Sequence, residues 1–226
     1  MTWVAKPSGG YVLGSQESIE NISEMHKLLS RSGYTLEAEA GIIGNAFHES
    51  GLNPWRWQND TVNMLYGGYG LFQYTASSGA ATDRYIEVCR NLPYYAPNLS
   101  VSSITTGALP TDGICQVNVF ITDYLNKWYP ALWRTYWPSN QELRDKCNAI
   151  LSTYGNGSSI TQAQFSRIPD VEAATITFLG CFEGPAVPNY TVRVNTAYEV
   201  YTILKTIAHK GGKMPLWMMM KPHWKL

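Results

Sequence analysis

Residues 36–54, LEAEAGIIGNAFHES followed by GLNP, decide how the chain is organised. Thr35 precedes this stretch and is a candidate N-cap, because its hydroxyl can accept a hydrogen bond from the first helical turn. Gly51 can adopt the left-handed conformation that ends a helix, and Asn53-Pro54 favours a turn. The pattern therefore predicts a largely apolar helix that ends at Ser50.

Glu49 lies at the end of this helix and on its inward face, one turn after Asn45. Glu39, in contrast, is expected on the charged face. An apolar setting disfavours the ionised form of a carboxyl, so we expect Glu49 to hold a proton and to act as a general acid. The alternative is a structural carboxylate paired with Arg56 or another cation. His48 is expected to be a partly exposed neighbour without a catalytic role.

A long irregular segment follows, from Trp55 to about Gly79, with a short hairpin expected inside it. Its centre is Gly67-Gly68-Tyr69-Gly70-Leu71-Phe72-Gln73-Tyr74. Glycines let a backbone approach a ligand closely, a Gln amide can bond sugar hydroxyls, and aromatic rings can stack on a sugar face. The segment is thus a candidate sugar-binding bend, and the alternative is a tight hairpin filled by aromatic side chains.

Helical periodicity dominates the rest of the chain. Helices are predicted between Ser15 and Gly33, at about 80–92, 112–129 and 140–154, after Thr161, from Asp170 to Phe182, and from Thr191 onward. The inner face of the last helix is expected to carry Val194, Tyr198, Tyr201, Leu204 and Ile207. These elements indicate an α-rich single domain with one long insertion.

The composition limits the functional classes. Hydrophobic residues make up 45% of the 226 residues, and 17 basic residues balance 17 acidic ones, which argues against nucleic acid as the main partner. No apolar run is long enough for a signal peptide or a membrane span, so we expect synthesis in a cytoplasm. The cysteines have no metal-ligand spacing, so buried thiols are expected, with disulfides left open: Cys89, Cys115, Cys147 and Cys181.

The expected organisation is a lead-in at 1–14, a domain at 15–210 and a tail at 211–226. The tail is apolar and rich in Met and Trp, with interspersed lysines. Exposed apolar segments usually meet a partner, so we expect a docking strip for another protein. The alternatives are a segment that touches a membrane interface and a linker.

Three motifs occur in order along the chain. The first is Gly41-x-x-Gly44-Asn45 with Glu49-Ser50 and Asn53-Pro54; the second runs from Gly68 to Thr75; the third is Phe178-Leu179-Gly180-Cys181-Phe182-Glu183-Gly184-Pro185. Together they resemble, over about 34–205, the phage tail lysozyme family, which belongs to the superfamily of goose-type lysozymes and lytic transglycosylases. Tyr74 replaces the usual Trp, and Phe182 replaces the usual Tyr and lacks its hydroxyl.

The resemblance implies a mainly α, α+β lysozyme-like fold, with a long loop or short hairpin inserted after the catalytic helix. It also implies cleavage of the β-1,4 bond between N-acetylmuramic acid and N-acetylglucosamine, with no metal or organic cofactor. Glu49 would be the general acid, and the substrate contacts would be Gln73, Tyr74, Tyr69, Gly70 and Asn53. The protein would act on the host cell wall from the virion, and the tail would bind other virion proteins.

The second carboxyl of such a glycosidase is not fixed by the sequence. The candidates are Glu183, Asp60, Asp83 and Asp112. Glu183 has a structural alternative, in which it bonds loop amides near Gly184-Pro185, and Asp112 has one as the N-cap of its helix. If no second carboxyl faces the cleft, the substrate's own hydroxyl or acetamido group would attack, as in a lytic transglycosylase. Hydrolysis is preferred; a non-catalytic tail-tip or glycan-binding module is the remaining alternative.

Overall fold

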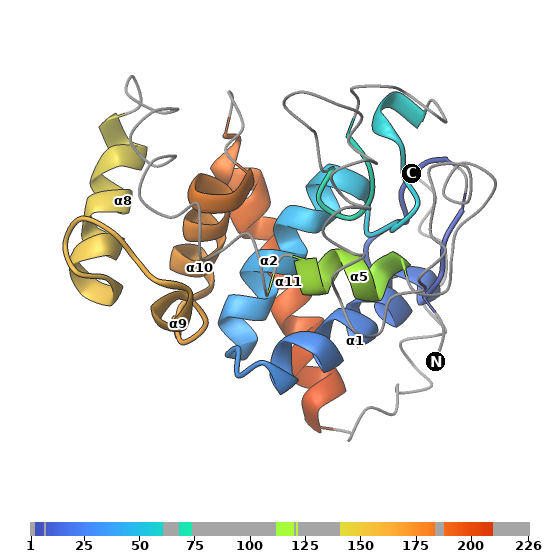
Figure 1. Ribbon diagram of the computed structural model, residues 1–226, viewed down its shortest axis with the longest axis horizontal. Coiled ribbons are helices and arrows are strands. Elements are labelled where there is room, and N and C mark those ends of the chain that lie inside the picture. The colour runs from blue at the N-terminus through green and yellow to red at the C-terminus, as the bar shows by residue number, and fades with distance from the viewer. Residues whose placement is uncertain are drawn as a thin grey trace.

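The computed structural model describes residues 3–6, 8–60, 68–73, 112–119, 121, 141–183 and 188–209. Over these ranges the chain is mainly helical, and its only β-type pairing is an isolated bridge (Figure 1). The predicted mainly α fold is therefore confirmed. The predicted helix at 80–92, the candidates Tyr74 and Asp83, and the predicted docking tail at 211–226 lie outside the described residues.

The first two helices begin at the predicted caps. Helix α1 spans Gln16–Arg31 after Ser15, and α2 spans Leu36–Ser50 after Thr35. The Thr35 hydroxyl accepts a hydrogen bond from the Ala38 N–H. Gly51 ends α2 with a φ of 60°, in the left-handed region. Local sequence therefore sets the bounds of both helices.

The later helices follow the pattern with one change of geometry. Asp170 caps α10, but the helix predicted to reach Phe182 becomes a π-helical turn at Leu179. The short helix predicted after Thr161 is present, and Thr161 and Gln164 form a capping box at its start. The remaining elements are α5 (Asp112–Val119), α8 (Gln141–Tyr154), α9 (Gln162–Phe165), α10 (Val171–Phe178), the π-helix η3 (Leu179–Glu183) and α11 (Tyr190–His209).

Helix α2 is the central element, packed against α10, α11 and α1 (Figure 1). Two of its glycines allow this close packing. A Cβ added at Gly41 would lie 2.7 Å from the backbone of Ala174, and one added at Gly44 would lie 2.9 Å from the Ala197 Cα. Such contacts are shorter than packed side chains tolerate. The Gly-x-x-Gly spacing of the first motif therefore lets α2 contact α10 and α11 backbone to backbone.

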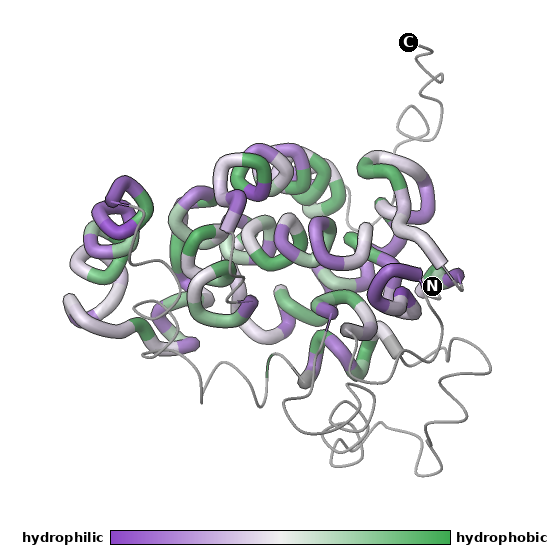
Figure 2. The backbone as a smooth tube through the Cα atoms, turned by 90° about the horizontal axis from the view of Figure 1, so that it is seen from above, coloured by the Kyte–Doolittle hydropathy of each residue, from purple (hydrophilic) through white to green (hydrophobic). Residues whose placement is uncertain are grey.

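Hydrophilic and hydrophobic residues alternate along the helices, as Figure 2 shows. In α11 the predicted inner face is partly wrong. Val194, Leu204 and Ile207 are buried, but Tyr198 is 47% exposed and Tyr201 only half-buried. The buried stripe instead begins at Arg193 and continues through Ala197, Val200, Leu204 and Ile207.

Within the irregular segment, the stretches before residue 61 and after residue 67 pair in antiparallel fashion, as expected for a short hairpin. Trp57 and Tyr69 form an antiparallel bridge, the Gln58 N–H donates to the Gly68 carbonyl at 2.8 Å, and the Gly70 N–H donates to the Arg56 carbonyl at 2.9 Å. Three of the predicted buried thiols are also confirmed, since Cys115, Cys147 and Cys181 are buried and free; Cys89 lies outside the described residues.

Candidate active site

Glu49 forms an ion pair with an arginine from the far end of the chain. Its Oε1 accepts a hydrogen bond from Nη2 of Arg193, in the first turn of α11, at 2.6 Å. The Glu49 side chain is 21% exposed and that of Arg193 10%. The expectation of a purely apolar setting for Glu49 is therefore wrong. Of the cations considered, Arg56 bonds Asp60 at 3.1 Å instead.

Asn45 holds this arginine in place. Nη1 of Arg193 donates to the Asn45 Oδ1 at 3.1 Å. The Asn45 Nδ2 donates to the carbonyl of Gly41 at 2.8 Å and to that of Thr175 at 3.2 Å. The Asn45 side chain is fully buried, and through these hydrogen bonds its amide group connects α2, α10 and α11. The Asn of the first motif therefore orients the partner of Glu49.

Glu183, at the end of η3, interacts electrostatically with both Glu49 and Arg193. Burial, and secondarily the negative charge of Glu49, raise the pKa of Glu183 well above its usual value of 4.5, while Arg193 opposes the shift. Its Oε1 is buried and has no hydrogen-bond partner among the described residues. We call Glu49, Arg193 and Glu183 the Glu–Arg–Glu cluster. π-helical turns often occur at functional sites, and η3 places Glu183 in the Glu–Arg–Glu cluster.

The other candidates for a second carboxyl are not in the cluster. Asp60 accepts a hydrogen bond from the Gly9 N–H at 2.6 Å and pairs with Arg56, and these contacts lower its pKa. The side chain of Asp112 lies outside the described part of the chain, as does Asp83. Among the candidates that the structure describes, Glu183 is therefore the one that joins Glu49.

His48 is half-buried, as expected for a neighbour of Glu49. Its Nε2 lies 2.9 Å from the Thr196 Oγ1 on α11. Burial, and secondarily the positive charge of Arg193, lower the pKa of His48 below 6.5. Both effects favour the neutral imidazole.

The residues of the predicted sugar-binding bend make contacts inside the protein that stabilise the bend. Tyr69 is fully buried, with its ring 4.7 Å from that of Trp57, so it is not placed to stack on a sugar. Gly70 has a φ of 81° and its open side faces the Gln116 amide rather than an outside ligand. Gln73 has a φ of 47°, and its Nε2 donates to the carbonyls of Arg56 at 3.1 Å and Gly70 at 3.0 Å. The expectations for Tyr69 and Gly70 as direct contacts are therefore replaced by structural roles.

Asn53 is likewise fully buried and satisfied. Its Nδ2 donates to the carbonyls of Lys6 at 2.9 Å and Gly9 at 2.8 Å, and its Oδ1 accepts from the Trp55 N–H at 3.1 Å. With both amide hydrogens used inside the protein, Asn53 fastens the lead-in segment to the turn. We therefore no longer expect it to contact substrate.

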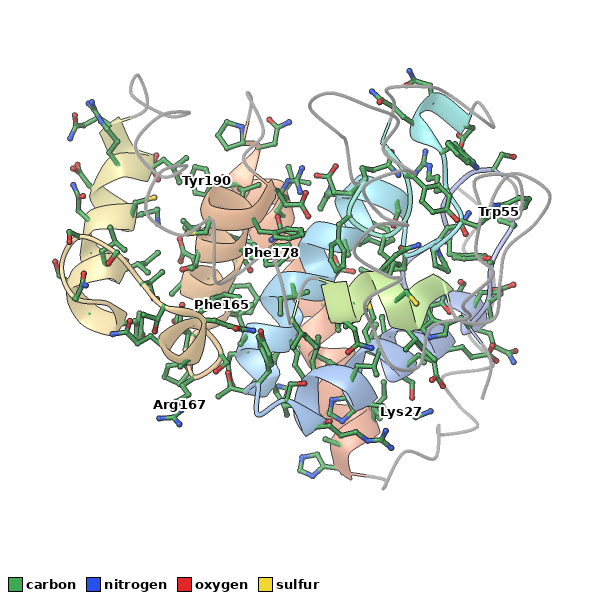
Figure 3. All side chains as sticks on the ribbon, viewed as in Figure 1. Lys27, Trp55, Phe165, Arg167, Phe178 and Tyr190 are labelled. Atoms are coloured by element: carbon green, nitrogen blue, oxygen red, sulfur yellow. The ribbon has the colours of Figure 1, made fainter. Side chains whose placement is uncertain are left out.

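Aromatic contacts bring the second motif to the third. The Phe72 ring lies 5.8 Å from that of Phe178 and 5.5 Å from that of Phe182, and the last two are stacked at 4.7 Å. Phe178 lies near the centre of the molecule in Figure 3. A phenyl ring at position 182 suits this apolar cluster, because its neighbours are the rings of Phe72 and Phe178. The bend is thereby packed against α10 and η3, and η3 is the element that ends at Glu183.

Two residues that build the site were missed from the sequence. The fully buried Gln116 accepts from the Leu71 N–H and donates to the Pro54 carbonyl, both at 2.6 Å, and so joins the two loops. Arg193 was missed because the inner stripe of α11 was phased wrongly. The sequence signal that could have found it is the helical spacing of Arg193 to Ala197, Val200 and Leu204, which places it in the buried stripe. A cation in a buried stripe requires a buried anion as its partner.

Neither a metal site nor a membrane span emerges from the described residues. No group of three or more His, Cys, Asp or Glu side chains among them is arranged to hold a metal ion. Across the same part of the chain, no helix has both the length and the apolarity that crossing a bilayer requires.

The described residues form a mainly α, lysozyme-like fold. The family described as phage tail lysozyme matches residues 20–204, and the chain belongs to that family. The match includes all three members of the Glu–Arg–Glu cluster. Membership indicates a peptidoglycan-lytic role in the context of a phage tail, and association with the virion.

Proposed function

We propose that this protein is a glycoside hydrolase that cuts the β-1,4 bond between N-acetylmuramic acid and N-acetylglucosamine in peptidoglycan. The observation that supports the proposal is the Glu–Arg–Glu cluster, which stands where the three sequence motifs meet. A glycosidase uses two carboxyls, one as acid and one as base. Their different surroundings keep one protonated while the other is ionised.

The two carboxyls have different roles in this proposal. Glu49, whose side chain is 21% exposed, delivers a proton to the leaving oxygen. Glu183 holds that proton in the free protein, because burial and the charge of Glu49 raise its pKa. Glu183 transfers the proton to Glu49, Glu49 passes it to the departing sugar, and the ionised Glu183 then accepts a proton from the attacking water. The proton count closes over one turnover.

Substitution of Glu49 tests this function. Glu49→Gln keeps the side-chain shape but cannot donate a carboxyl proton, and we expect the rate of clearing of purified cell walls to fall about 100- to 10,000-fold. The matched control is Glu199→Gln, an exposed glutamate on α11, which should clear walls at the wild-type rate. Circular dichroism establishes that both variants are folded. Clearing by Glu49→Gln at the wild-type rate would remove Glu49 from the mechanism.

A lytic transglycosylase is the second candidate, and the burial of the Glu183 Oε1 favours it. If Glu183 does not reach water, Glu49 acts alone as acid and then as base, and the 6-hydroxyl of the muramic acid attacks. Mass spectrometry of the released glycans separates the two, because hydrolysis leaves reducing ends and the alternative leaves anhydro sugars. Wall binding without either product would indicate a non-catalytic module.

A further inference from the structure

Arg193 has the geometry of a clamp. It is buried, and its two terminal nitrogens donate to different residues of α2: Nη2 to Glu49 at 2.6 Å and Nη1 to Asn45 at 3.1 Å. Asn45 is itself fixed by the carbonyls of Gly41 and Thr175. The guanidinium therefore has a defined orientation before any substrate arrives.

We propose that Arg193 is a positioning residue for the glycan cleavage: it holds one oxygen of the Glu49 carboxylate so that the other is presented to the glycosidic oxygen. This inference rests on the proposed function. Guanidinium is planar and offers donors in a fixed fork, whereas the ammonium of lysine is a point charge. One lysine would not reproduce both contacts, so the fork carries the positioning.

The charge of Arg193 also bears on the groups that face it. These are Glu49 and His48 from α2 and Glu183 from η3. Arg193 lowers the pKa of Glu183 against the larger effect of burial, and lowers that of His48 in addition to burial. The positive charge of one guanidinium thus offsets the negative charge of two carboxyls, which allows both carboxyls to occupy the same site.

Three variants test the positioning role: Arg193→Gln, Arg193→Lys and, as matched control, Arg167→Gln. Arg167 is exposed and lies at the periphery of the molecule in Figure 3. On soluble glycan fragments we expect Arg193→Gln to lower kcat about 100-fold, as for a misplaced catalytic group, with KM changed less than about twofold. Arg193→Lys should recover part of kcat, and Arg167→Gln should match wild type.

The pH dependence gives a readout that a merely structural role would not change. Without the guanidinium, the pKa of Glu183 and that of His48 should both rise, since Arg193 lowers each. Carboxyl and imidazole titrations followed by NMR should show both midpoints at higher pH in Arg193→Gln. The alkaline limb of the activity profile should move in the same direction.

If Arg193→Gln does not fold, Asn45→Ala replaces it, because this variant keeps the charge of Arg193 and removes the second contact of the fork, together with the Asn45 hydrogen bonds to Gly41 and Thr175. A folded variant of either kind with wild-type kcat and an unchanged pH profile would overturn the role of Arg193 and leave the proposed function standing. Loss of kcat that is fully explained by a smaller folded fraction would overturn it as well. If the wild type releases no glycan product, the proposed function itself fails, and the positioning role falls with it.

Discussion

Two carboxyls among the described residues, those of Glu183 and Glu39, have a buried oxygen without a hydrogen-bond partner, and each is stabilised differently. Glu183 interacts with Arg193, whereas Glu39 is fully buried and its Oε2 lies 2.6 Å from Nδ1 of His26. Burial raises the pKa of Glu39, and His26 opposes the shift. The expectation that Glu39 lies on a charged face is wrong, because α1, α10 and α11 all pack against α2.

Glu183→Gln should change how stability depends on pH. The folded protein keeps a proton on Glu183 that the unfolded chain releases near the ordinary value of 4.5. Stability is therefore undiminished below that pH and declines as pH rises from 4.5 through the raised folded pKa. Glutamine cannot ionise, so urea unfolding from pH 4 to 8 should show a smaller decline in the variant. An identical decline in both proteins would contradict the protonated state of Glu183.

At the scale of elements, the contact between α2 and α11 positions the cluster. Glu49 and Asn45 on one helix meet Arg193 on the other, and Gly44 sits against Ala197 one turn further along α11. The glycine sets the separation of the helices, and the separation sets the reach of the guanidinium. A small change in packing therefore changes the site.

Gly44→Ala tests this contact. Helix propensity alone would make the variant more stable, by about 1 kcal/mol. The added methyl would lie 2.9 Å from the Ala197 Cα, so we expect a net loss of about 1–3 kcal/mol instead. Chemical denaturation measures the difference, with Glu199→Ala on the exposed face of α11 as the control. A more stable Gly44→Ala would show that α2 and α11 can separate without cost.

At the scale of the whole molecule, the described part of the chain is held together by packing rather than by covalent links. Its three cysteines are buried as free thiols in α5, α8 and η3. Burial, and secondarily Cys147, raise the pKa of the Cys181 thiol. Since the thiolate is the reactive form, this thiol is inert in the folded protein.

Thiol labelling checks this arrangement. Cys115, Cys147 and Cys181 should react with a soluble thiol reagent slowly in the native protein and fully after unfolding, as followed by peptide mass spectrometry. Because none of these three cysteines forms a disulfide, reducing agent acting on them should not change the Tm. Rapid labelling of any of the three in the native state, or a disulfide between two of them, would contradict their burial as free thiols.

The sequence by itself determined the local features. The caps at Ser15, Thr35 and Asp170 and the stop at Gly51 were predicted correctly, because each depends on hydrogen bonds between residues a few positions apart. The three motifs also identified the family and singled out Glu49 and Glu183, since their residue types and order are legible without coordinates. The catalytic role of these two carboxyls stays a prediction.

Only the tertiary structure decided how these carboxyls are partnered. The Arg193–Glu49 contact joins residues 144 positions apart, and it depends on the rotational phase of α11, which a weakly amphipathic helix does not reveal. The same holds for the π-helical turn that places Glu183 and for the internal hydrogen bonds of Asn53. A side chain's neighbours are fixed by how helices pack, and packing is a property of the whole chain.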